Sequence, residues 1–294
     1  MMKVSCVLGF LLLLAVLTPA DTNIAVSLSL DWERMEINAT MALDLTAAGI
    51  RLPTGRSQAE EILNLESPDL LRPYLLSIPV DSSSTLEDLA RRGEFSLRAA
   101  GSLVLSARKT PPALSPDLRR LSTAYAIDLI AISSQLIRHS RALDVAQPLR
   151  PVPAASYTGI IIIANNELPI HGRQTEALVR PCIFPKIWDT NMNLIYERNM
   201  MEPSRGTTNS IVRYVSQDAI FQSGPSGLSP ELTGRVGSNP LRILARGVYG
   251  ILPTDLIIDQ EDALVILSSN ENRLLLREGR VAVVLSERVL KETR

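Results

Sequence analysis

Ile160-Ile161-Ile162-Ile163-Ala164 is the stretch that decides the fold of the second half of the chain. Four consecutive β-branched residues are too few for a helix and show no polar alternation, so they predict a strand buried on both faces. Such a strand needs a cover on each face, which is supplied by helices or a second layer of this chain, or by a partner subunit. The stretch therefore predicts a sheet with packed helices.

Further strands and one helix are predicted around this stretch. We expect a strand beside this stretch that contains 182–184 and 187–188, and another at 194–196 after a hairpin turn at 189–193. Further strands are expected at 211–215, 241–249, 256–258 and 280–285. Asp259 is placed to cap a helix over 259–268. Strands together with a helix in one segment indicate an α/β domain.

A proline-rich segment separates this domain from the first half of the chain. Pro148, Pro151 and Pro153 fall within nine residues, a composition typical of an extended linker. We place the linker at 147–156, an N-terminal domain at 21–146 and a C-terminal domain at 157–294.

The N-terminal half also mixes strands and helices. Alternating apolar residues predict a β-hairpin over 24–30 and 35–45. Helices are predicted at 57–65, from Pro68 onward and at 86–90, and a strand is predicted at 94–105. Residues 117–138 fit either one long helix or a helix together with a strand. The fold class is therefore α/β (α+β): two small modules of mixed sheet with packed helices, joined by the linker.

The first twenty residues have the order of a secretory signal peptide. Lys3 precedes an apolar run over 7–16, and Thr18-Pro19-Ala20 ends the segment with small residues. The run is about half the length that a bilayer span requires, so we expect cleavage after Ala20, with an uncleaved anchor as the alternative. We expect an exported, periplasmic or envelope-associated protein with no transmembrane span after signal removal.

Composition argues against several classes of function. Thirty Lys and Arg balance 31 Asp and Glu, so no strong electrostatic field attracts nucleic acid. Two His, two Cys and no G-x-S-x-G elbow lead us to expect no catalytic, cofactor or metal site. After cleavage Cys182 is the only thiol, and its apolar surroundings predict a buried, unpaired and unreactive side chain.

One compact polar loop follows the isoleucine strand. Leu168-Pro169-Ile170-His171-Gly172-Arg173 lies where α/β proteins often present binding groups. We take Glu167, His171 and Arg173 as a candidate partner or ligand loop, and a simple connection as the alternative.

The second domain also resembles a known family in short motifs. Tyr157-Thr158-Gly159-Ile160-Ile161-Ile162, Phe184-Pro185-Lys186-Ile187-Trp188-Asp189 and Ile195-Tyr196-Glu197 resemble the bacterial small-lipoprotein family, which includes the flagellar outer-membrane assembly protein FlgP. The resemblance covers about residues 157–285, but Ala164-Asn165-Asn166-Glu167 stands where the family places Asp-Ala-Arg-Gly, and the lipid-attachment cysteine is missing. It implies an α/β module of envelope-associated, often flagellar, assemblies and no catalytic residues.

Together these features predict an exported, non-enzymatic envelope protein that acts as a structural or assembly component, with the flagellum as one place of assembly. Its expected partners are further copies of itself or envelope and flagellar proteins. The alternative is a periplasmic ligand-binding protein or a hydrolase that uses the His171 loop.

Overall fold

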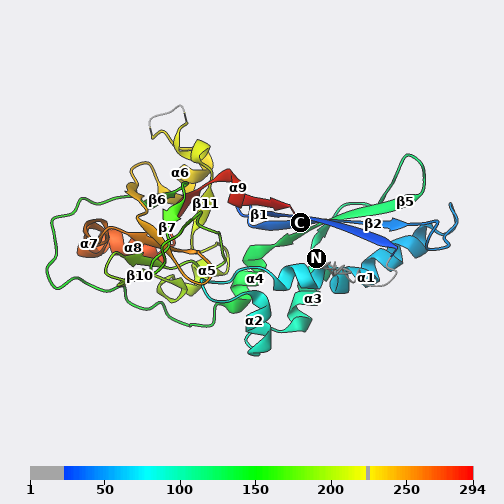
Figure 1. Cartoon of the computed structure of the whole chain (residues 1–294), viewed down its shortest axis with the longest axis horizontal. Helices are drawn as coiled ribbons and strands as arrows, with labels where there is room; N and C mark the ends of the chain where they lie inside the picture. The colour runs from blue at the N-terminus through cyan, green and yellow to red at the C-terminus, as the bar shows by residue number, and fades with distance from the viewer. Residues whose placement is uncertain (1–22, 223–225, 294) are drawn as a thin grey trace, which may run out of the picture.

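The computed structural model describes residues 23–222 and 226–293. Its two domains lie side by side along the long axis of the molecule (Figure 1). Both contain sheets with packed helices, which confirms the predicted mixed α/β class. Among the helices of the described residues, none is long and apolar enough to cross a membrane. The predicted signal peptide lies outside the described residues.

One antiparallel sheet with helices against it forms the N-terminal domain. The elements are β1 (Ile24–Asp31), β2 (Glu36–Asp44), α1 (Arg56–Leu76), α2 (Leu86–Arg91), α3 (Leu97–Leu105), β3 (Arg108–Lys109), β4 (Ala113–Leu114), β5 (Arg120–Asp128) and α4 (Leu129–Leu136). The strand order is β16-β1-β2-β5-β3, in which β16 (Lys291–Thr293) is the last strand of the described chain, and β4 also pairs with β5. The predicted hairpin is confirmed as β1 and β2, whose side chains alternate between buried and more exposed.

The two helices predicted on either side of residue 67 form one continuous helix, α1, which contains Pro68 and Pro73. Pro68 has no N–H for the carbonyl of Asn64, four residues earlier. The hydroxyl of Ser67 donates to that carbonyl at 3.1 Å instead. This side-chain hydrogen bond replaces the missing backbone one, so the helix continues through the proline.

Two other predictions for this domain are wrong. The strand expected over 94–105 is the helix α3, because Ser96 accepts a hydrogen bond from the N–H of Arg98 and the buried Ala100, Leu103 and Val104 lie on one helical face. Over 117–138 the strand β5 comes first and the helix α4 second. Asp128 fixes that boundary, because its carboxylate accepts from the N–H of Ile130 at 2.7 Å.

The second domain contains a parallel sheet and a mixed sheet. Its strands are β6 (Ile160–Ala164), β7 (Leu168–Pro169), β8 (Glu176–Ala177), β9 (Ile187–Asp189), β10 (Leu194–Tyr196), β11 (Arg213–Val215), β12 (Leu241–Leu244), β13 (Gly247–Tyr249), β14 (Asp255–Ile258) and β15 (Val281–Leu285). Its helices are η1 (Arg198–Met200), α5 (Pro203–Gly206), η2 (Gln217–Ile220), α6 (Pro230–Val236), α7 (Gln260–Ser268), α8 (Asn270–Arg277) and α9 (Glu287–Leu290). The parallel sheet has the order β11-β15-β6-β12, and the mixed sheet has the order β10-β9-β14-β13. β7 and β8 form a separate two-stranded sheet.

The isoleucine strand β6 is a central strand, buried as predicted. It pairs in parallel with β15 on one side and β12 on the other. Ile160 and Ile162 belong to the main core, whereas Ile161 packs on the opposite face in a smaller cluster that includes Leu232 and Val236 of α6. The chain itself therefore covers both faces.

Three further details differ from the predicted arrangement. The hairpin of β9 and β10 lies in the mixed sheet and not beside β6, and 182–184 form no strand. The strand expected over 241–249 is divided into β12 and β13, which lie in different sheets. The last strand, β16, returns to the N-terminal domain and pairs antiparallel with β1 (Figure 1), so the C-terminal domain does not contain the end of the described chain.

Candidate functional site

The structure places the predicted loop residues Glu167, His171 and Arg173 in and beside the hairpin of β7 and β8, where all three are exposed. The backbone N–H of His171 donates to the carbonyl of Val248 at 2.8 Å, and its ring meets the Tyr249 ring edge-on at 6.0 Å. Among the described residues, no hydrogen bond or ion pair joins the three side chains to one another. The loop is therefore held by its backbone, and its charges are not assembled into one site.

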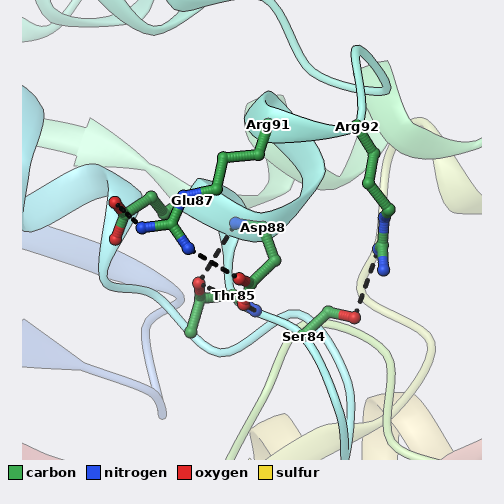
Figure 2. A network of polar contacts seen from close by, with 6 residues as sticks. All are labelled: Ser84, Thr85, Glu87, Asp88, Arg91 and Arg92. Carbon is green, nitrogen blue, oxygen red and sulfur yellow. Dashed lines mark hydrogen bonds and ion pairs between the residues drawn. The ribbon is translucent and has the colours of Figure 1, made fainter.

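A more elaborate constellation lies where the two domains meet, and it begins in the loop 79–85 ahead of α2. Thr85 and Asp88 form a capping box: the Thr85 hydroxyl accepts from the N–H of Asp88, and the Asp88 carboxylate accepts from the N–H of Thr85 at 2.9 Å. Arg92 donates to the Ser84 hydroxyl at 3.2 Å, and Arg91 pairs with Glu87 (Figure 2). These contacts hold the loop in one shape, and the bond from Thr85 lowers the pKa of Asp88.

The second domain makes backbone hydrogen bonds to this loop on two sides. On one side the N–H groups of Ile183 and Phe184 donate to the carbonyls of Pro79 and Val80, at 3.1 and 2.8 Å. On the other side the N–H of Leu252 donates to the carbonyl of Ser82 at 3.0 Å. The loop is thus joined to the second domain by backbone hydrogen bonds on both sides.

Asp255 is the centre of this junction and is fully buried. Its carboxylate accepts from the Ser82 hydroxyl at 2.8 Å, from the indole N–H of Trp188 at 3.1 Å and from the backbone N–H of Lys186 at 3.1 Å. Burial raises the pKa of Asp255, while the hydrogen bonds from Trp188 and Ser82 act in the opposite direction. Because this buried carboxylate takes its hydrogen-bond donors from both domains, separating the domains would leave it with an unsatisfied oxygen. The contact therefore favours the joined arrangement.

Aromatic side chains make a second contact between the domains. Trp32 follows β1 and meets Tyr214 of β11 edge to face, with ring centroids 5.9 Å apart. The Tyr214 hydroxyl donates to the carbonyl of Cys182 at 2.9 Å and accepts from its N–H at 3.1 Å. Both rings are buried, so this contact adds apolar area to the polar junction.

The Cys182 thiol is free and completely buried, and burial raises its pKa. Because the thiolate is the reactive form, we expect thiol reagents to label the folded protein far more slowly than the protein in denaturant. A colorimetric thiol assay on both samples measures the two rates. Equal rates, or a covalent dimer that reduction removes, would contradict this prediction.

Gly250 lies against the loop 79–85, where the structure leaves no space for a side chain. Its φ is +120°, and a Cβ would lie 2.4 Å from the Cβ of Ser82 and 2.5 Å from the carbonyl oxygen of Leu252. We expect Gly250→Ala to lower the free energy of unfolding by about 2 to 4 kcal/mol, because backbone strain and steric overlap add.

Gly172 provides the matched control for this substitution. Its φ is also positive, at +78°, but a Cβ there meets nothing within 4 Å. Gly172→Ala therefore carries only the backbone strain, and denaturant titration should show a loss of about 1 kcal/mol. Equal losses in the two variants would show that contact with the loop is unimportant.

An open cavity of about 420 Å³ lies at the carboxyl ends of β6 and β15. Asn165, Gln217 and Arg288 are among its lining residues, and the Asn165 amide donates to Gln217 at 2.8 Å. This edge of a parallel sheet is where α/β proteins commonly bind ligands. Among the described residues, no group of three or more His, Cys, Asp or Glu could hold a metal ion.

Sequence reasoning missed the junction because its residues are distant in the chain. Ser82 and Asp255 are separated by 173 positions. Residues 82–85 are typical of a helix N-terminus, and the structure shows that Thr85 caps α2, so their sequence gives no sign of a contact with the second domain. The one available signal was Asp255 itself, a carboxylate directly before the apolar strand residues Leu256, Ile257 and Ile258, which predicts a buried acid in need of partners.

The fold and the junction together define a two-domain, mixed α/β protein whose domains are joined through a buried polar contact. Residues 23–135 match the family model described as Treponema pallidum Tp0624, N-terminal domain, and residues 159–287 match that of Treponema pallidum Tp0624, second domain. The matches cover both halves of the chain, which therefore belongs to the Tp0624 family. A search of curated proteins finds no match.

These matches correct the resemblance to the small-lipoprotein family and its FlgP-like members, which is wrong. The motifs behind it perform local backbone tasks that unrelated sheets share. Gly159 is required because a Cβ would lie 2.4 Å from the carbonyl oxygen of Val236. Asp189 closes a hairpin by accepting from the N–H groups of Asn191 and Asn193. Such residues indicate a turn or a close approach between backbone segments, and they do not identify a family.

Proposed function

We propose that the chain is an exported, non-enzymatic scaffold of the cell envelope, in which the two domains act as one rigid block that assembles with further copies of itself or with envelope proteins. The observation that carries this proposal is the junction centred on Asp255. The hydrogen bond from Ser82 to Asp255 and the backbone hydrogen bonds of Ile183 and Phe184 cross the domain boundary. A binding protein that works by domain closure needs a junction that opens, whereas a scaffold benefits from a fixed one.

Export and envelope association are supported by the order of residues 1–20, in which a charge, an apolar run and small residues follow one another. A structural role is supported by the way the described residues use their reactive groups. The thiol of Cys182 is buried, and the Asp255 carboxylate has three donors.

Chemical cross-linking in cells that produce the chain, followed by fractionation, tests this proposal. We expect the chain in the exported fraction and in cross-linked species larger than one chain. Asp255→Ala should reduce those species, because it loosens the block, while Leu244→Ala on an exposed position of β12 should leave them unchanged. A chain retained in the cytoplasm, or one that is cross-linked to nothing, would contradict the proposal.

Binding of a small polar ligand is the second candidate function, and the cavity beside Asn165 and Arg288 favours it. The cavity has amide and guanidinium groups at the carboxyl edge of the parallel sheet, whereas the His171 loop has no assembled site. Melting of the protein in the presence of a panel of sugars and amino acids tests this candidate. A ligand that raises the melting temperature of the native chain but not of Asn165→Ala would support it.

A further inference from the structure

The outer edge of β1 is only partly covered in the described part of the chain. β16 pairs with Ser29, Leu30 and Asp31, and no described strand pairs with the outer edge from Ile24 to Leu28. On the other side of the sheet, β3 and β4 both pair with β5. On the β1 side of the N-terminal sheet, the described strands therefore leave an edge of five residues unpaired.

The hydrogen-bonding groups at this edge follow from the pairing of β1 with β2. The N–H of Asp44 donates to the carbonyl of Asn23, so the odd-numbered residues of β1 exchange hydrogen bonds with β2. The N–H of Trp32 donates to Leu290, so the even-numbered residues face outward. The backbone N–H and C=O groups of Ile24, Val26 and Leu28 thus point away from the sheet, where they can form hydrogen bonds with another strand.

The described residues of this edge carry none of the features that protect natural edge strands from a second strand. Natural edge strands commonly carry a lysine, a proline or a bulge, and Ile24-Ala25-Val26-Ser27-Leu28 has no charge and no proline. The solvent-facing rows beside it are small and uncharged: Ala25, Ala42 and Ser122 lie in register in one row, and Ser27, Thr40 and Ala124 lie in the next. Charged residues stand at the ends of the sheet, as in the pair of Glu36 and Arg108.

We propose that the open edge of β1 pairs antiparallel with the same edge of a second copy of this chain. The sequence is self-complementary for this pairing, because a two-fold axis at Ala25 brings Ile24 of each copy opposite Val26 of the other. Both residues face outward, so each of these pairs exchanges two hydrogen bonds. Between Asn23 and Ser27, no charge meets a like charge in this register. The two sheets then form one continuous sheet across the dimer.

This inference rests on the proposed scaffold function and specifies its partner and surface. Protein purified from the exported fraction is studied by sedimentation velocity over a range of concentrations. We expect the native chain to dimerise and Ala25→Lys to weaken the dimer at least about 100-fold, because the axis places the two introduced charges opposite each other. Ala25→Glu should do the same, and an equimolar mixture of the two variants should dimerise again.

Ser122→Lys is the matched control, since Ser122 lies in the same row as Ala25 but on β5, away from the open edge. It should dimerise like the native chain. Val26→Pro, which removes one outward N–H and no bond to β2, should be folded and monomeric.

A native chain that stays monomeric overturns the edge proposal, as does an Ala25→Lys variant that dimerises normally or a Ser122→Lys variant that is equally impaired. The scaffold proposal is tested separately by cross-linking in cells, so the two failures are distinguishable.

Discussion

Asp255→Ala is expected to lower the free energy of unfolding by about 3 kcal/mol or more. The substitution leaves the hydroxyl of Ser82, the indole N–H of Trp188 and the backbone N–H of Lys186 without their common acceptor. Each buried donor that loses its partner costs about 1 to 3 kcal/mol. Denaturant titration of the full chain measures the loss.

Asp69→Ala is the control for this variant. Asp69 is an exposed aspartate that pairs with Arg72 three residues away, and its loss should change stability by less than about 0.5 kcal/mol. A similar small effect for Asp255→Ala would show that the buried carboxylate does not hold the junction.

The pKa of Asp255 also gives this residue a distinct pH signature. Because burial raises its pKa in the folded state, the folded chain holds this proton at pH values where the unfolded chain has released it. The contribution of Asp255 to stability is therefore greatest in acid and is lost as pH rises through the folded pKa. Asp88, whose pKa is lowered, contributes in the opposite direction.

The difference between the native chain and Asp255→Asn isolates that signature, because the asparagine does not titrate. We expect the stability of the native chain relative to the variant to fall as pH rises from below the ordinary aspartate pKa. A difference that is constant with pH would contradict the assignment.

Ile162→Ala and Ile161→Ala should each cost about 2 to 5 kcal/mol, which is a large share of the stability of an ordinary domain. Both side chains are fully buried, and they lie on opposite faces of β6 in separate clusters. Because this chain covers both faces, both variants should lose stability, and neither should change association by exposing a subunit contact.

Chemical denaturation compares these variants with Leu244→Ala, whose side chain on neighbouring β12 is 58% exposed. That control should remain close to the native stability. If one isoleucine variant kept its stability but lost association, a partner subunit would be covering that face.

Local patterns in the sequence predicted much of the fold. Four isoleucines identified β6, and alternating apolar residues identified the hairpin of β1 and β2, because both signals depend on near neighbours. The prediction of a strand over 94–105 was wrong, because its apolar residues fit both the two-residue period of a strand and the 3.6-residue period of a helix. The cap at Ser96 favours the helix.

The candidate site could not be predicted in the same way. It forms only when the loop with Ser82, the segment at Ile183 and the strand that begins with Asp255 come together. The spacing of apolar residues along the sequence does not predict contacts between segments that lie so far apart in the chain. The return of β16 to β1 is another pairing between distant parts of the chain, and only the folded structure shows it.

Differential scanning calorimetry of the full chain tests most directly whether the junction makes the two domains one unit. If it does, the protein unfolds in a single transition, and the calorimetric enthalpy equals the van't Hoff enthalpy. Two separate transitions, with one for each domain, would contradict the account, because the domains would then be independent bodies connected by a linker.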